Sequence, residues 1–128
     1  MIPFRLVPRP GVPVADQVVF AAKKAILGGK LQPGDPFPSV RALARAMKIH
    51  PNTAQKVVAQ LADEDLLQVL PGIGTVVAQP TASRGGARLL APGIEQLVVQ
   101  ALQTGITLEE LQFAIDRCWF TLTGAERR

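Results

Sequence analysis

Apolar side chains recur at helical spacing through the first half of the chain. From Val14 they fall three or four residues apart until the glycine pair 28–29, which predicts a helix that ends there. A second apolar series reaches Met47, and it is preceded by Ser39, a residue type favoured at the N-cap. The pattern predicts two helices joined by a turn within Leu31–Pro38, which is rich in proline and glycine.

A third helix is predicted only three residues further on. Pro51 follows Met47 after this short gap, and proline is favoured in the first turn of a helix because its missing N–H would be unpaired there anyway. His50 is then the N-cap, and the helix runs to about Asp65. Its inward face is expected to carry Ala54, Val57, Val58 and Leu61, which leaves a polar tip at its N-terminus.

Two short β-strands are predicted after the third helix. The sequences LLQVL (66–70) and TVVAQ (75–79) flank the tight segment PGIG (71–74), which is typical of a β-hairpin. Before the first helix, residues 2–13 contain four prolines, and we expect an extended lead-in there.

The last third of the chain predicts a separate helical region. The segment Gln79–Ala87 is rich in small and polar residues and is the best candidate for a linker. One helix is expected from about Pro92 to Gly105, and a second after Thr107, which forms a capping box with Glu110. The predicted domains are therefore 10–79, a linker at 80–91, and a two-helix region at 92–124.

The positive charge is concentrated in the first domain. Residues 1–80 carry nine basic and five acidic side chains, whereas residues 81–128 carry five of each. The stretch from Pro36 to Ala62 contains no acid, and its basic residues are Arg41, Arg45, Lys48 and Lys56. A basic face of this kind suits an anionic partner such as nucleic acid, although it is also compatible with an ordinary solvated surface.

Composition excludes several other classes of protein. No apolar run approaches the roughly 18 residues that a membrane helix needs, and the first twenty residues lack the apolar core of a signal peptide, so a cytoplasmic protein without membrane contact is expected. The single cysteine, Cys118, and the single histidine, His50, form neither a disulfide framework nor a zinc motif. Nothing in the sequence indicates a metal or a cofactor.

The predicted order of elements is that of a winged helix-turn-helix. A short turn lets the third helix cross the second, the inner positions are apolar, and the outer face of the third helix is polar. The fold class is therefore mainly α with a small β-hairpin as the wing, followed by a short two-helix C-terminal region.

The segment LQPGDPFPSVRALARAMKIHPNTAQKVVAQLADEDLLQVLPGIGTVV (31–77) resembles the GntR family of bacterial transcriptional regulators. The shared features are the Pro-Gly turn, the PSVR-x-LA helix, the NT start of the recognition helix and the G-x-G-T wing. The start HPNTAQK and the short tail with TGITLEEL are similar to the YtrA-like branch. The resemblance implies a sequence-specific DNA-binding regulator, a repressor in this branch, with no enzymatic activity.

Four side chains are expected to carry most of the DNA recognition. The family's PSVR motif implies that Arg41 reaches DNA, where a guanidinium can grip a phosphate or the O6/N7 edge of guanine. Asn52 and Gln55 carry amides that can pair with the N6/N7 edge of adenine in the major groove. Lys56 can bind a phosphate as a point charge.

Other residues of the expected DNA-facing set have competing roles. The Thr53 hydroxyl can donate to a phosphate, but Asn52 and Thr53 are also favourable near the start of a helix for local capping alone. His50 is expected to cap the helix rather than bind a metal. The remaining members of the set are Ser39, Gly72, Gly74 and Thr75.

The wing departs from the family pattern. Leu70, Pro71 and Ile73 stand where members of the family usually carry arginine or lysine, although Gly72 and Gly74 still allow the tight turn. We therefore expect DNA binding to depend more on the recognition helix, with Ile73 packing on a sugar or on protein.

The tail is expected to make a homodimer. Two amphipathic helices in 48 residues cannot cover each other's apolar faces, so the tail must pack either on the first domain or on a second copy of itself. The expected dimer stripe is Leu111, Ile115, Cys118, Trp119 and Leu122. The tail is too short to be a sensor domain, so any small-molecule effector would bind between subunits.

Two functions stay open from the sequence. The first is a homodimeric transcriptional regulator bound to an inverted-repeat operator in double-stranded DNA, and the alternative is a winged-helix module for protein interaction with weak or no DNA binding. An aminotransferase fusion, known in the family, is excluded by length, and no catalytic constellation is present.

Overall fold

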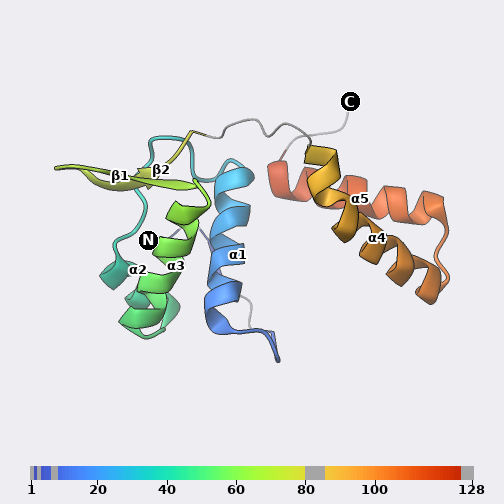
Figure 1. The fold of residues 1–128 in the computed structure, drawn as a ribbon, viewed down its shortest axis with the longest axis horizontal. Helices are drawn as coiled ribbons and strands as arrows, with labels where there is room; N and C mark the ends of the chain where they lie inside the picture. The colour runs from blue at the N-terminus through green and yellow to red at the C-terminus, as the bar shows by residue number, and fades with distance from the viewer. Residues whose placement is uncertain (1, 3, 7–8, 80–85, 125–128) are drawn as a thin grey trace. The chain divides into compact units, whose positions relative to one another are not determined.

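The structure is a computed structural model that describes residues 2, 4–6, 9–79 and 86–124. The chain divides into two compact units, Met1–Pro80 and Thr81–Arg128. The elements of the first unit are α1 (Val14–Leu27), α2 (Val40–Met47), α3 (Pro51–Asp63), β1 (Leu67–Leu70) and β2 (Gly74–Val77), and those of the second are α4 (Gly86–Thr104) and α5 (Leu108–Thr123) (Figure 1). The fold class predicted from the sequence is confirmed for the winged first unit.

The core of the first unit is built where the helical spacing predicts it. α3 contacts both α1 and α2, and Leu43, Val57 and Leu61 have no exposed surface. On α1 the residues that helical spacing places on one face are buried, and two further ones join them; the first set is Val18, Ala22, Ala25 and Ile26, and the second is Val19 and Ala21. Burying side chains of this size removes roughly 1.5–3 kcal/mol each of unfavourable hydration, so these contacts fix the position of α3.

Both predicted N-caps of the helix-turn-helix are present. The Ser39 hydroxyl accepts a hydrogen bond from the Ala42 N–H (3.1 Å), and His50 Nδ1 accepts one from the Asn52 N–H (3.0 Å). α2 ends in a turn in which the Ile49 N–H donates to the Ala44 carbonyl (3.0 Å). Lys48 adopts the left-handed conformation in this turn, with φ 56°. The turn between α2 and α3 is therefore closed by backbone and side-chain bonds on both sides.

The wing is an antiparallel hairpin with a tight turn. Leu67 pairs with Val77 and Leu70 with Gly74, and the Ile73 N–H donates to the Leu70 carbonyl (3.1 Å). Gly72 has φ 77°, which the third residue of a type II turn after proline requires. In Figure 1 the hairpin projects past the helices of its unit.

The segment before α2 lines the other edge of β2, which the sequence did not predict. The Phe37 N–H donates to the Thr75 carbonyl, the Val77 N–H to the Asp35 carbonyl (2.9 Å each), and Pro36 bridges Val76. Phe37 in turn stacks on Phe4 of the lead-in, with ring centroids 6.1 Å apart. Backbone hydrogen bonds therefore tie the segment that leads into α2 to the second strand of the wing.

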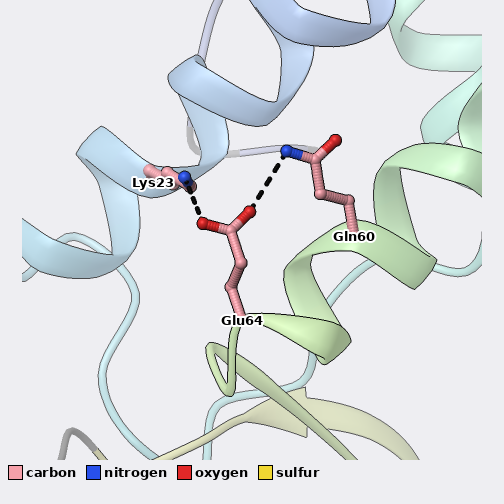
Figure 2. A network of polar contacts seen from close by, with 3 residues as sticks. All are labelled: Lys23, Gln60 and Glu64. Carbon is pink, nitrogen blue, oxygen red and sulfur yellow. Dashed lines mark hydrogen bonds and ion pairs between the residues drawn. The ribbon is translucent and has the colours of Figure 1, made fainter.

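A polar network ties the end of α3 to α1. Lys23 Nζ lies 2.6 Å from Glu64 Oε1, and Gln60 Nε2 donates to Glu64 Oε2 (3.1 Å) (Figure 2). Hydrogen bonds from Lys23 and then Gln60 lower the pKa of Glu64 below its usual 4.5. The network thus supplements the apolar contact between the two helices.

The second unit differs from prediction at its start. α4 begins at Gly86, so residues 86–91 of the predicted linker are helical, and Pro92 lies inside the helix rather than at its start; residues 80–85 lie outside the described residues. The helix extends to both sides of Pro92. Arg88, Leu89 and Leu90, which precede the proline, are good helix formers. Proline lacks an N–H, so one backbone carbonyl loses its helical hydrogen bond, and on this exposed stretch that carbonyl can bond water instead.

The turn between α4 and α5 follows the sequence prediction. The Ile106 N–H donates to the Ala101 carbonyl (3.2 Å), and Gly105, with φ 78°, ends α4. α5 begins with the predicted capping box, in which the Glu110 N–H donates to the Thr107 hydroxyl and the Thr107 N–H to Glu110 Oε1 (3.1 Å each).

Candidate nucleic-acid interface

The first turn of α2 presents a positive charge where helix electrostatics disfavour one. Arg41 is exposed, α2 has no acidic residue in its first turn, and Arg45 follows four residues later on the same side of the helix. A cation near a helix N-terminus and a like charge at i+4 are each unfavourable by a few tenths of a kcal/mol. An anion bound at this surface would relieve both effects.

The start of α3 presents the predicted polar side chains together. Asn52, Gln55 and Lys56 are exposed, whereas Thr53 is half-buried, and the first turn contains no acid. His50 is exposed, but its Nδ1 is occupied by the cap. The structure therefore brings amide and ammonium groups to one exposed helix tip, whose free backbone N–H groups also favour anions.

An open groove separates α2 from the start of α3. Its lining is Val40, Arg41, Ala44, Arg45, Ile49 and Pro51, so its floor is apolar and both of its charged residues are arginines. Arg45 was not among the DNA-facing residues expected from the sequence, although its spacing of four residues from Arg41 was a usable signal. The groove joins the two helix ends into one basic surface.

The wing brings no charged side chain to its tip. Ile73 is 75% exposed and Val69 is 67% exposed, while Thr75 is half-buried on β2. Gly72 and Gly74 are exposed with positive φ angles. The described residues leave most of the Ile73 side chain uncovered, so it is open to a partner.

One member of the expected dimer stripe is placed differently. Leu111 is buried, as is Ala101 of α4. Cys118 is exposed, as are the remaining members of the stripe: Ile115, Trp119 and Leu122. α5 thus keeps an apolar surface that its own unit does not cover.

Among residues 2, 4–6, 9–79 and 86–124, no group of three or more histidine, cysteine, aspartate or glutamate side chains is arranged to hold a metal ion. In the same ranges no helix is both long and apolar enough to cross a membrane.

A hydrogen-bonded helix-turn-helix, a hairpin wing and a basic helix tip define a winged helix-turn-helix regulator. Residues 14–77 match the sequence profile of the family described as bacterial regulatory proteins, gntR family, and the chain belongs to this family. The resemblance stated from the sequence is thereby confirmed.

Known proteins support this family assignment both by sequence and by structure. The chain is 34% identical over 107 residues to the HTH-type transcriptional repressor YtrA of Bacillus subtilis (strain 168), covering 81% of this chain and 82% of the relative. The structure of a transcriptional antiterminator from Listeria monocytogenes EGD-e covers 98% of this chain and 96% of its own, with TM-score 0.82, and at 22% identity it shows the fold alone. AraR(DBD) in complex with operator ORX1 is 27% identical over 57% of this chain and 93% of its own, with TM-score 0.51.

Proposed function

We propose that the protein is a transcriptional repressor that binds an inverted repeat in double-stranded DNA as a homodimer. The observation that carries the proposal is the surface on which Arg41, Asn52, Gln55 and Lys56 are exposed together without an acidic neighbour in the first turn of either helix. The AraR(DBD) complex with an operator supports the same use of this fold.

In this proposal α3 enters the major groove by its N-terminal end. Asn52 and Gln55 pair with base edges, adenine being the best match for an amide, while Lys56 and Thr53 bind phosphates. Arg41 approaches from α2 and binds either guanine or a phosphate. The caps at Ser39 and His50 hold both helix ends in place for these contacts.

The homodimer is proposed from the tail. Ile115, Trp119 and Leu122 are 46%, 64% and 40% exposed, and an apolar face of this size is normally covered in solution. Pairing two copies through one two-fold axis covers it and places two recognition helices for the half-sites of an inverted repeat. In this proposal a small-molecule effector would bind between the two tails.

Retention of genomic DNA fragments on the purified protein, followed by sequencing, tests the DNA-binding proposal. An enriched inverted repeat at moderate salt is the expected result, and its absence would overturn the proposal. Asn52→Ala and Gln55→Ala should each weaken binding by about 1–3 kcal/mol and relax the base preference at one position of each half-site. A DNA target also implies action in the cytoplasm, and the regulators that this chain resembles give no reason to propose catalysis.

A protein-interaction module is the second candidate, and one observation favours it. The exposed apolar side chains of Val69 and Ile73 at the wing tip are unusual for a surface that faces a polyanion. If this candidate is right, the wild-type chain should retain no DNA in the sequencing experiment, and Ile73→Asp should abolish capture of a protein partner.

A further inference from the structure

We infer that Arg45 and Lys48 bind DNA phosphates along the edge of the groove between α2 and α3, and that they supply the positive charge that the wing lacks. The inference rests on the proposed function, because its ligand is the backbone of the same DNA duplex. Neither residue belongs to the PSVR or NT motifs, and both lie between them in the chain.

The first observation is the composition of the groove. Its charged lining residues are Arg41 and Arg45, one helical turn apart on α2, and Pro51 opens α3 on the other side. Among the described residues, the ion pair found is between Lys23 and Glu64, and none involves either arginine. Two uncompensated guanidinium groups on an open groove fit an extended polyanion better than a single carboxylate partner.

The second observation is the conformation of Lys48. It occupies the position after α2 where a left-handed φ of 56° is needed, a position that glycine fills most often. The left-handed conformation is unfavourable for a non-glycine residue, and a lysine offers no local hydrogen bond that offsets this cost. Its exposed ammonium stands two residues before the N-cap of α3. A phosphate contact accounts for a charged side chain at a position where glycine would be more stable.

The third observation is the wing, whose exposed tip is apolar at Ile73. Phosphate contacts contribute much of the affinity of most DNA-binding proteins, and each one releases counterions. If the wing has no charged side chain to contact phosphates, other cations of the first unit must make the phosphate contacts. Arg45 and Lys48 are the exposed cations next to the recognition helix that have no assigned role.

Binding of fluorescent duplexes across about 50–200 mM salt tests the inference, with one duplex carrying the enriched repeat and one of random sequence. Arg45→Gln and Lys48→Gly should each weaken binding to both duplexes by a similar factor, about three- to tenfold, and reduce the salt slope by about 0.9 per protein chain bound. Lys48→Gly cannot fail by misfolding, because glycine suits that backbone. Lys30→Gln, which removes the same charge from an exposed turn of the same unit, is the matched control.

Three outcomes would count against the inference. Salt slopes of Arg45→Gln and Lys48→Gly equal to that of the control Lys30→Gln would overturn the inference while leaving the proposed function intact. A change in the preferred base on Arg45→Gln would also overturn it, since it would mean a contact to a base rather than to the backbone. A wild-type chain that binds neither duplex would overturn the proposed function and this inference together.

Discussion

At the scale of single residues, Lys48 is a position where the best residue for stability differs from the one proposed for DNA binding. Its left-handed backbone conformation, with φ 56°, is unfavourable for a lysine and unstrained for glycine. Lys48→Gly should therefore raise the free energy of unfolding by about 1 kcal/mol, partly offset by the greater freedom of glycine in the unfolded chain. Urea unfolding followed by circular dichroism measures the change.

Asp65 is a matched control for the Lys48 variant because it too is left-handed, with φ 61°, in the turn that ends its helix, where the Leu66 N–H donates to the Leu61 carbonyl as the Ile49 N–H does to the Ala44 carbonyl. Aspartate tolerates the left-handed region better than lysine does, since its short side chain can hydrogen-bond locally. Asp65→Gly should therefore stabilise less than Lys48→Gly. Equal gains at both sites would mean that the strain depends on the turn and not on the lysine.

The Glu64 carboxylate predicts a pH dependence of stability. Its pKa is lower in the folded chain than the usual 4.5, because Lys23 and Gln60 donate to the charged form. The contribution of Glu64 is therefore fully present above about pH 4.5 and is lost as the pH falls through the lower folded-state value. Glu64→Gln should lower the unfolding free energy at pH 7 by about 0.2–1 kcal/mol, a range that allows for solvent screening of this partly exposed pair.

Urea unfolding at pH 7 and pH 3 measures this difference, which should shrink at the lower pH. Asp63→Asn tests whether any carboxylate at the end of α3 gives the same result, since Asp63 has no ion pair within 4.0 Å among the residues that the structure describes. A constant penalty for Glu64→Gln at both pH values would contradict the role assigned to its charge.

At the scale of elements, the wing and the helix tip should contribute unequally to DNA affinity. Arg41→Ala removes a cation from the helix surface, whereas Ile73→Asp adds an anion to a wing tip that has no charge. We expect Arg41→Ala to weaken operator binding about tenfold or more and Ile73→Asp to weaken it less. Fluorescence anisotropy on the enriched repeat compares them, and equal losses would contradict a subordinate wing.

The elements also show what the sequence can and cannot predict. The caps at Ser39, His50 and Thr107 were predictable because each depends on a side chain bonding to its own segment. The start of α4 was not, because Pro92 signals a helix start locally while the residues before it sustain the helix. Phe4 beside Phe37 was not predictable either, since such a contact depends on how distant segments fold together.

The candidate interface follows the same division. The exposure of Asn52, Gln55 and Lys56 was predicted by helical spacing from the apolar face of α3. The groove that adds Arg45 depends on the angle between two helices, and the left-handed Lys48 depends on how α2 ends, so both needed the structure. The burial of Leu111 could not be predicted from periodicity alone, which places it on the same stripe as the exposed Ile115.

At the scale of the whole molecule, the tail should set the affinity for DNA without touching it. Ile115 lies on the exposed stripe of α5, and Phe113, also exposed, lies on nearly the opposite side of that helix. In the proposed homodimer, Ile115→Asp buries an unpaired charge and should convert dimers to monomers, whereas Phe113→Asp should leave them paired. Light scattering on the purified variants gives the mass directly.

The two variants should then differ on DNA in a way that depends on the number of half-sites. Two linked recognition helices bind more tightly than one, because binding of the first raises the effective concentration of the second. Ile115→Asp should therefore lower the affinity about a hundredfold or more for a duplex with both half-sites, and hardly at all for a duplex with a single half-site. Phe113→Asp should match wild type on both duplexes. Dissociation by Phe113→Asp alone would place the interface on the other face of α5, and equal losses on one and two half-sites would mean that the tail acts on the recognition helix itself rather than by pairing.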